Sequence, residues 1–356
     1  MVLEEYIQQG EPEQVEKSEA WQIAIGLQQV DGLNISTYLL GIAKEHIAGK
    51  ITIYEVQKLI LSYYQEHCNR IENNTKEADI VSARVTQLLE EKTYKFSPVE
   101  LMSIHRCLFD GVFENAGEIR NYNISKKEWV LNGDTVIYAS WNGLKDVLDY
   151  EFKMEKSFSY EKLPLSEIIK HFASFTSDIW QIHPFGEGNT RTIAVFIIKY
   201  LRTIGLEING EVFKKHSWFF RNALVRANYN DLQNGIHSTT RFLEMFFSNL
   251  LLGANYELKN RYVHVDFNFR DEEDFQSAKL EAPKCQFGTL ECTLEEITLL
   301  NLISKDTSIT QKRLVEETGK SIRTIKRVMA SLQERGIIRR VDGKRFGKWE
   351  VLVERK

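Results

Sequence analysis

The chain has 356 residues, of which 43% are hydrophobic and 27% are charged, and its formal net charge is −4. This composition is typical of a globular protein with two or three domains, and it excludes a chain that is basic throughout for nucleic-acid binding. The four cysteines form no CxxC pair and have no zinc-ligand spacing with histidine. The amino-terminal residues are acidic and no apolar run is long enough to span a bilayer, so we expect a cytoplasmic protein.

Apolar residues recur every three or four positions along most of the chain, which predicts a mainly helical protein. Near the amino terminus, Gly32 is expected to end one helix and Ser36 to cap the next, while Ser97 is expected to cap a later helix. Residues 1–60 are interpreted as a helical module that regulates the rest of the chain. The helices predicted in this half are two within residues 18–50, one each over 54–72 and 77–91, and one that starts at Pro98.

A different pattern occupies residues 120–140, where "EWVL" and "TVIYA" flank the turn "NGD". A short turn between β-branched and aromatic residues predicts a β-hairpin. Helices are expected again over residues 143–256. Residues 266–288 then lose the helical periodicity and carry a run of charges and a proline, so we predict a linker there.

The carboxy-terminal residues 289–356 resemble the winged helices of transcription factors. Three predicted helices are followed by two short strands around the turn "DG", and this order of elements is typical of a winged helix-turn-helix. The predicted helices cover residues 293–304, 310–318 and 321–335.

Charge supports a separate role for this carboxy-terminal segment. Residues 287–356 contain 15 Lys and Arg against 10 Asp and Glu, although the whole chain is acidic. The last of the three helices would present Arg323, Lys326 and Arg327 to the major groove of DNA. The alternative is a solvated basic face on a protein-interaction module.

The densest group of polar residues is "HPFGEGNTR", residues 183–191, which lies between two predicted helices. N–H groups at the start of a helix bind anions, and the two glycines let phosphate oxygens approach the backbone. Asn189 and Arg191 can donate hydrogen bonds to phosphate, and Glu187 is an oxygen ligand suited to Mg²⁺. His183 can take a proton from a hydroxyl near neutral pH. The combination predicts nucleotide chemistry.

The same segment resembles the signature of Fic (Fido) domains, His-x-Phe-x-Asp/Glu-Gly-Asn-x-Arg. Upstream, "FENAGEIRNYNISKKEW" resembles the part of that family that leads into a β-hairpin called the flap, and "SWFFRNALVRANYNDL" resembles its helix beside the nucleotide base. The resemblance covers residues 61–265 and implies a helical bundle with a β-hairpin flap. It also implies that AMP is transferred from ATP, with Mg²⁺, to a Ser, Thr or Tyr hydroxyl of a target protein.

The resemblance assigns roles to individual residues. His183 would be the general base, Glu187 would hold Mg²⁺, and Arg191 would bind the β-phosphate. The residues implied to line the nucleotide site are Phe185, Gly186, Gly188, Asn189, Thr190, Arg191 and Tyr229. The flap residues implied to hold a target segment by strand pairing are Val130, Leu131, Thr135 and Val136.

Two positions depart from the AMP-transferring members, whose signature continues Gly-Arg-x-x-Arg. Thr190 replaces the glycine, and Ala194 replaces the second arginine, which grips the γ-phosphate. Relatives of the Doc type also lack that arginine and transfer the terminal phosphate, so a Doc-like phosphotransferase is one alternative. A DNA-binding regulator whose Fic domain senses a nucleotide is another. Retention of the histidine favours an enzyme, because a sensor needs no base.

In the family, an inhibitory glutamate pairs with that second arginine. Two segments resemble the inhibitory motif: "CNRIEN" offers Glu72 and "LQQVDGL" offers Asp31. The alternatives are an exposed acid at a helix end for Glu72 and a helix-terminating turn at Asp31. The expected partners are a target protein and, through the winged helix, DNA; no membrane is expected, and the chain is compatible with a homo-oligomer.

Overall fold

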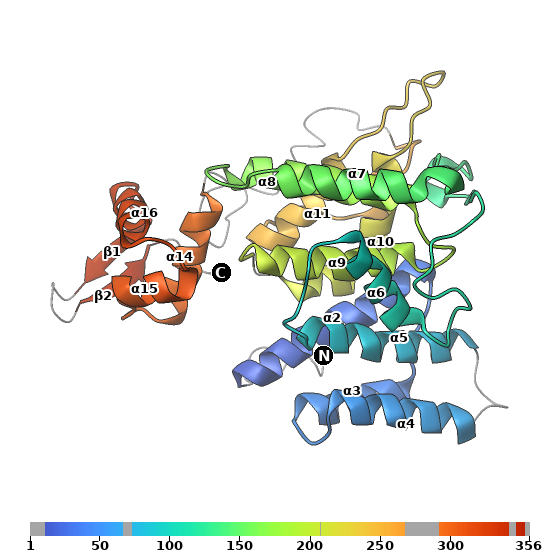
Figure 1. The fold of residues 1–356 in the computed structure, drawn as a ribbon, viewed down its shortest axis with the longest axis horizontal. Coiled ribbons are helices and arrows are strands. Elements are labelled where there is room, and N and C mark those ends of the chain that lie inside the picture. Colours follow the sequence, from blue (N-terminus) through green and yellow to red (C-terminus); the bar gives the residue numbers. More distant parts are fainter. Residues whose placement is uncertain (1–10, 67–72, 207, 268–291, 342–346, 353–356) are drawn as a thin grey trace.

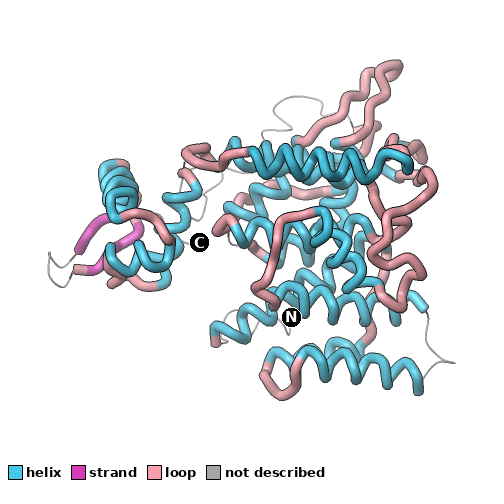
Figure 2. Tube along the Cα trace, in the orientation of Figure 1, coloured by secondary structure: helices cyan, strands magenta, loops and turns pink. Residues whose placement is uncertain are grey.

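A computed structural model describes residues 11–66, 73–206, 208–267, 292–341 and 347–352. This part of the chain is mainly helical, as predicted, and the strands within it form one two-stranded sheet (Figures 1 and 2). None of the described helices is both long and apolar enough to cross a membrane.

The amino-terminal helices end where the sequence predicts. Gly32 has a φ of 69° and ends the 3-10 turn Gln29–Asp31, and the Ser36 side chain accepts the Leu39 N–H at 3.0 Å. Glycine tolerates this left-handed backbone and a serine hydroxyl satisfies a free helical N–H, so both residues act through local physics. The helices are α2 (Pro12–Gln28), α3 (Thr37–Ile47), α4 (Ile53–Glu66) and α5 (Asn73–Glu90).

The main body of the protein is built around α9 (Asn189–Thr203), in which every residue from the first to Leu201 is buried. Helices on all sides of α9 supply a continuous apolar core that is rich in phenylalanine. The helices that pack directly on α9 are α2, α5, α6 (Pro98–Phe109) and α8 (Leu165–Ile182). The same core continues through α7 (Leu144–Ser157), α10 (Gly210–Ala227), α11 (Arg241–Leu252) and α12 (Asn260–Val263).

Helix α2 packs against α5 and α10, whereas α3 and α4 lie outside it at the edge of the body (Figure 1). Gly26 allows the close crossing with α10, because a Cβ atom there would lie 2.5 Å from the Lys214 Cα. The Ser217 hydroxyl donates to the Gly26 carbonyl at 2.6 Å across the same crossing. Trp21 faces the other way and lies in a second core with residues of α3 and α4. The carboxyl end of α2 is thereby fixed against the main body.

The segment predicted as a β-hairpin does reverse at Asn132 and Gly133, but it contains no strand. Trp129–Leu131 form a 3-10 turn, and the Glu128 N–H donates to the Asp134 carbonyl at 2.8 Å across the reversal. Val130 and Leu131 are consecutive and both fully buried. Because a strand would point neighbouring side chains to opposite faces, the core selects a helical turn instead. The predicted hairpin is therefore wrong in its strands and right in its turn.

The carboxy-terminal unit has the predicted order of elements. Helices α14 (Leu294–Lys305), α15 (Gln311–Thr318) and α16 (Ile322–Glu334) precede the antiparallel strands β1 (Ile338–Val341) and β2 (Lys348–Val351). The Leu165 N–H at the start of α8 donates to the Cys292 carbonyl at 3.1 Å, which joins the unit to the main body. Most of the predicted linker and the turn "DG" lie outside the described residues.

Candidate functional site

The loop between α8 and α9, residues 183–188, is closed by a side chain rather than by regular backbone pairing. The Phe185 N–H donates to Asn189 Oδ1 at 3.0 Å, and Asn189 Nδ2 donates to the Phe185 carbonyl at 2.8 Å. Phe185 itself is fully buried. The loop therefore stays fixed at the start of α9, where the first N–H groups of the helix have no helical partner and can bind an anion.

His183 follows the last turn of α8 and has a left-handed backbone, with a φ of 51°. Its Nδ1 lies 3.3 Å from the Trp180 carbonyl. A carbonyl oxygen only accepts, so Nδ1 carries the proton and Nε2 keeps its lone pair. Nε2 is buried and has no hydrogen-bond partner among the described residues. It is the atom that would take a proton from a substrate.

Burial holds the pKa of His183 well below its ordinary value, and the nearby charges of Lys126, Arg120 and Arg221 lower it further. The hydrogen bond to the Trp180 carbonyl opposes this shift, and the sum leaves the imidazole neutral at pH 7. A general base must be unprotonated to act, so this surrounding suits the predicted role.

Arg120, which the sequence places in the "AGEIR" segment, positions the His183 backbone. Its guanidinium donates to the carbonyls of His183 at 2.7 Å, Ala139 at 2.5 Å and Ile182 at 3.3 Å, and also to that of Tyr122. The side chain is 5% exposed. One arginine thus joins the end of α8 to both ends of the segment that carries the 3-10 turn.

Sequence reasoning missed His105, which lies on α6 and supports the loop from behind. The Gly117 N–H donates to His105 Nδ1 at 2.7 Å, so Nε2 carries the proton and donates to the Glu187 carbonyl at 3.1 Å. Its ring stacks on Phe185 at 3.8 Å. Burial lowers the pKa of His105 to about 4. A single histidine on an apolar helix face gives no sequence signal for this role.

The loop glycines allow the backbone to approach aromatic side chains. A Cβ atom on Gly186 would lie 2.6 Å from the Tyr122 hydroxyl, and one on Gly188 would lie 2.4 Å from the Phe109 ring. Gly188 also has a φ of 71°. Gly188 therefore requires glycine both for space and for conformation, whereas a Cβ at Gly186 would only require the Tyr122 side chain to shift.

Alanine at Gly188 is therefore expected to destabilise the fold by about 3 kcal/mol, from the sum of left-handed strain and overpacking. Gly235 has a similar φ of 69° with nothing near its Cβ position, and it serves as the matched control. We expect G235A to cost only about 1 kcal/mol, because it carries the strain alone. Urea unfolding of both variants measures the difference, and equal losses would contradict the steric contribution.

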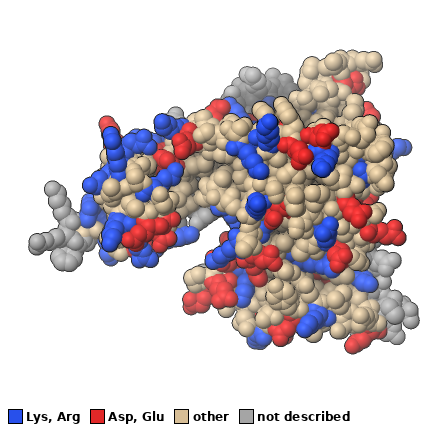
Figure 3. Space-filling view, in the orientation of Figure 1, with Lys and Arg blue, Asp and Glu red and all other residues tan. Residues whose placement is uncertain are grey.

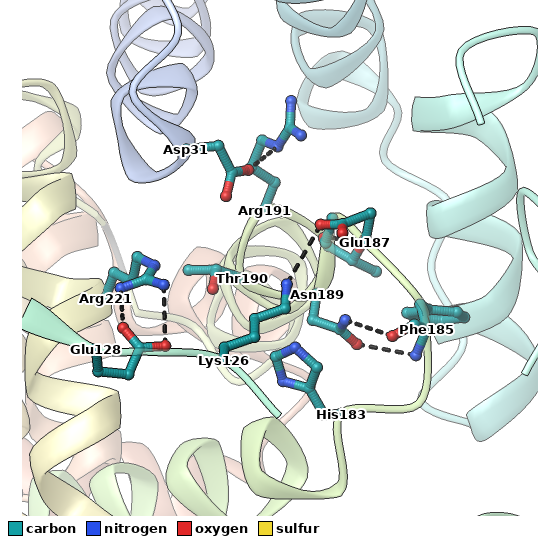
Figure 4. A network of polar contacts seen from close by, with 12 residues as sticks. Asp31, Lys126, Glu128, His183, Phe185, Glu187, Asn189, Thr190, Arg191 and Arg221 are labelled. Atoms are coloured by element: carbon teal, nitrogen blue, oxygen red, sulfur yellow. Dashed lines mark hydrogen bonds and ion pairs between the residues drawn. The ribbon is translucent and has the colours of Figure 1, made fainter. Parts of the chain in front are cut away.

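Arg191 is 2% exposed and is enclosed by α2 and α5 (Figure 4). Its Nε lies 2.8 Å from Asp31 Oδ2 and its Nη2 lies 2.7 Å from Glu77 Oε1. Nη1 donates to Gln28 Oε1 at 3.1 Å, and the guanidinium lies 4.8 Å from the centre of the Phe109 ring. Asp31 thus pairs with the arginine of the signature. The other candidate, Glu72, lies outside the described residues.

Glu187 points away from the core, with its side chain 65% exposed, and pairs with Lys126 Nζ at 3.3 Å. Among the described residues no group of three or more His, Cys, Asp or Glu could hold a metal by protein ligands alone. Mg²⁺ in nucleotide sites takes one or two carboxylates and completes its shell with phosphate oxygens and water. The single carboxylate of Glu187 fits that kind of site.

The two positions that depart from the family pattern are both built into the core. The Thr190 hydroxyl accepts the Trp180 indole N–H at 3.0 Å, and Ala194 is fully buried. Thr190 therefore holds α8 against α9.

The other predicted site residues meet at the segment that carries the 3-10 turn. The Tyr229 hydroxyl donates to Asp134 at 2.8 Å, and burial together with Asp134 raises the pKa of Tyr229 to about 12. Arg221 holds the buried Glu128 by two hydrogen bonds, at 2.6 and 3.1 Å, which sequence reasoning also missed. Tyr229 is thus placed to anchor this segment.

The residues predicted to dock a target are less accessible than expected. Val130, Leu131 and Val136 have buried side chains, and Thr135 is partly buried. The Val130 carbonyl already accepts the Val265 N–H at 2.9 Å. Exposed apolar side chains of this segment are those of Ile137, at 83%, and Trp129, at 54%.

The residues predicted to contact DNA are all exposed on α16. Arg323 and Lys326 face solvent, and Arg327 Nη2 lies 3.3 Å from Glu295 Oε2. Figure 3 shows Lys and Arg side chains gathered over this carboxy-terminal unit. The buried face of the same helix packs Ile325, Val328, Met329 and Leu332 into the unit.

Comparisons with known proteins match two parts of the chain to family models. Residues 95–201 match the model of the Fic/DOC family, and residues 296–339 match that of the winged helix-turn-helix DNA-binding family. A comparison with curated proteins found no match. A solved Fic family protein from Desulfovibrio desulfuricans G20 has 12% identity and a TM-score of 0.42, over 99% of this chain and 91% of its own. The chain therefore carries a Fic/DOC family domain over residues 95–201 and a winged helix-turn-helix over residues 296–339.

Proposed function

We propose that the chain transfers AMP from ATP to the hydroxyl of a Ser, Thr or Tyr residue on another protein. Domains of the Fic family generally transfer nucleotide or phosphate groups to proteins. The observation that carries the finer proposal is the buried Nε2 of the neutral His183 at the carboxyl end of α8, which has no hydrogen-bond partner among the described residues. A base of this kind serves a hydroxyl acceptor.

The proposed step begins when His183 Nε2 takes the proton of the target hydroxyl. The hydroxyl oxygen bonds to the α-phosphorus, the bond between that phosphorus and the oxygen bridging to the β-phosphate breaks, and pyrophosphate leaves with its electron pair. The free N–H groups at the start of α9 stabilise charge on the phosphate. Mg²⁺ at Glu187 would neutralise charge on the phosphates, and Arg191, once released, would bind the leaving group.

ATP labelled separately on the α- and γ-phosphates tests this proposal, with a protein extract as acceptor. We expect α-label on protein. Transfer of γ-label alone would indicate a Doc-like phosphotransferase. Absence of both labels, with the wild type and with D31N, would contradict an enzymatic function.

We also propose that Asp31 restrains the enzyme by holding Arg191 away from nucleotide. The geometry supports this, since the three nitrogens of the buried guanidinium contact Asp31, Glu77 and Gln28. The restraint acts on the one arginine of the signature that this chain retains.

His105 is proposed to position the loop by its two hydrogen bonds. Two substitutions distinguish the contributions of these two bonds. Gln keeps a donor near the Nε2 position, whereas Asn keeps an acceptor near the Nδ1 position. We expect H105N to weaken ATP binding roughly tenfold, because the Glu187 carbonyl loses its donor, and H105Q to stay within about threefold. Isothermal titration calorimetry measures both, and an equal loss would assign His105 a packing role only.

DNA binding by the winged helix is a second candidate function, favoured by the match at residues 296–339 and by the exposed Arg323, Lys326 and Arg327. Affinity is expected to fall steeply with salt, because phosphate contacts release counterions. Double substitution of Arg323 and Arg327 by alanine should abolish the gel shift. Unchanged binding would favour a protein-interaction module.

A further inference from the structure

Three cations lie close enough to His183 to lower its pKa, and they differ in how firmly they are held. Arg120 donates to four carbonyls, and Arg221 makes two hydrogen bonds to the buried Glu128. Releasing either of them would leave buried polar groups without partners, which is costly. Lys126 is different, because its ion pair is with Glu187, whose side chain is 65% exposed.

The ion pair of Lys126 is easily exchanged. At 3.3 Å and with the Lys126 side chain 30% exposed, it is a surface pair, and such pairs contribute little to stability. The Lys126 backbone, in contrast, is fixed: its N–H donates to Thr135 Oγ1 at 3.2 Å, and Glu128, two residues later, is held by Arg221. An anchored backbone with a releasable ammonium suits a residue that changes partner when a ligand binds.

Arg191, the cation that the signature assigns to phosphate, is enclosed by Asp31, Glu77 and Gln28 in this conformation. Lys126 is then the cation beside the loop that can meet an anion without breaking a buried contact. Figure 4 shows its side chain reaching across the loop to Glu187, on the side where His183 lies.

We propose that Lys126 is a phosphate-binding residue of the nucleotide site, and that its ammonium leaves Glu187 for a phosphate oxygen when ATP binds. This inference rests on the proposed nucleotide-dependent function. A triphosphate carries several negative charges and competes well for an ammonium held by one exposed carboxylate. Lys126 thus gives the site a first contact for ATP while Arg191 is still enclosed.

The test is ATP affinity, measured by isothermal titration calorimetry with Mg²⁺ on the full chain. K126A is expected to weaken ATP binding tenfold or more, as loss of a charge-assisted contact does. The neighbouring Lys127 is exposed and supplies the matched control, so K127A should bind within about twofold of the wild type. K126R should recover most of the affinity, which a loss of folding would not allow.

A second readout is the pKa of His183, followed by NMR of the histidine side chains. Since Lys126 lowers it, K126A is expected to raise this pKa and K127A to leave it unchanged. Equal ATP affinities for K126A and K127A would overturn the role of Lys126 and leave the proposed function intact. Absence of ATP binding by the wild type would overturn both. Weaker ATP binding by K126A, without any transfer of label by the wild type, would contradict the proposed transfer reaction and leave the role of Lys126 in ATP binding intact.

Discussion

Asparagine in place of Asp31 is expected to raise the rate of transfer from ATP about tenfold, equivalent to about 1.4 kcal/mol. The substitution keeps the shape of the side chain and removes one of the two carboxylates that hold Arg191. Asp31 is 37% exposed, so the effect is smaller than for a fully buried pair. Glu77 and Gln28 still contact Arg191 in this variant, and we expect D31N with E77Q to raise the rate further.

Stability distinguishes release of Arg191 from a general loosening of the fold. A buried guanidinium with fewer partners is unfavourable, so D31N should melt at a lower temperature than the wild type when no ligand is present. ATP should then raise the melting temperature of D31N by more than that of the wild type, because Arg191 gains a phosphate partner. Thermal unfolding with and without ATP measures this.

Glu13 supplies the control for these measurements. It lies in the first turn of α2, at the opposite end of that helix from the turn that carries Asp31, and it forms an exposed ion pair with Lys17. E13Q should change neither the rate nor the response to ATP. A folded D31N protein with the rate of the wild type would show that the ion pair with Asp31 does not limit the reaction.

The parts of the fold that sequence predicts well are those decided by local physics. Gly32, Ser36 and Ser97 end or cap helices where expected, because a left-handed glycine or a serine hydroxyl acts within a few residues. The strands of the winged helix are predicted for the same reason, since the dipeptide "DG" between two short segments is a local turn signal.

The segment around Asn132 shows why other parts are not predicted. Its β-branched and aromatic residues favour strands locally. The side chains of the consecutive residues Val130 and Leu131 are nevertheless both buried in the core, and a helical turn can bury two neighbouring side chains where a strand cannot. A tertiary contact overrides the propensity there. The turn itself is still predicted correctly, because asparagine and glycine tolerate a positive φ both in a β-hairpin and after a 3-10 turn.

The candidate site divides in the same way. The signature residues are contiguous, so the loop could be found from its sequence, whereas their partners are distant: Gln28 is the last residue of α2, Asp31 lies in the 3-10 turn that follows it, and Glu77 lies on α5. The motif around Asp31 predicted an inhibitory acid. In the family pattern such an acid pairs with a second arginine, which this chain lacks. Where that arginine would stand, Ala194 is buried, and Asp31 meets Arg191 instead.

Substitution of His183 is expected to have the largest effect on the reaction, with a loss of 10²- to 10⁴-fold, roughly the contribution of a general base. Gln is the better test than Ala, because the ring packs between Tyr138 and Trp180 and a cavity would disturb both. H183Q should keep ATP affinity while transfer of α-label is lost. Retention of transfer by a folded H183Q would assign the base to another group.

The pH dependence tests the same residue in the unchanged protein. The pKa of His183 lies below its ordinary value, so the neutral base persists into mildly acidic solution and the acid limb of the rate profile should lie below pH 6.5. His46 and His105 have pKa values lowered to about 4, so each of these two groups binds more protons in the unfolded chain than in the folded one between about pH 6.5 and pH 4, and each lowers the stability as the pH falls through that range. The raised pKa of Glu90, about 7, acts in the opposite direction, so stability must be followed across the same pH range. Initial rates must therefore be taken directly after transfer to the assay pH, with circular dichroism showing that the protein is folded. An acid limb at pH 6.5 or above in folded protein would contradict the neutral, buried His183 as the base.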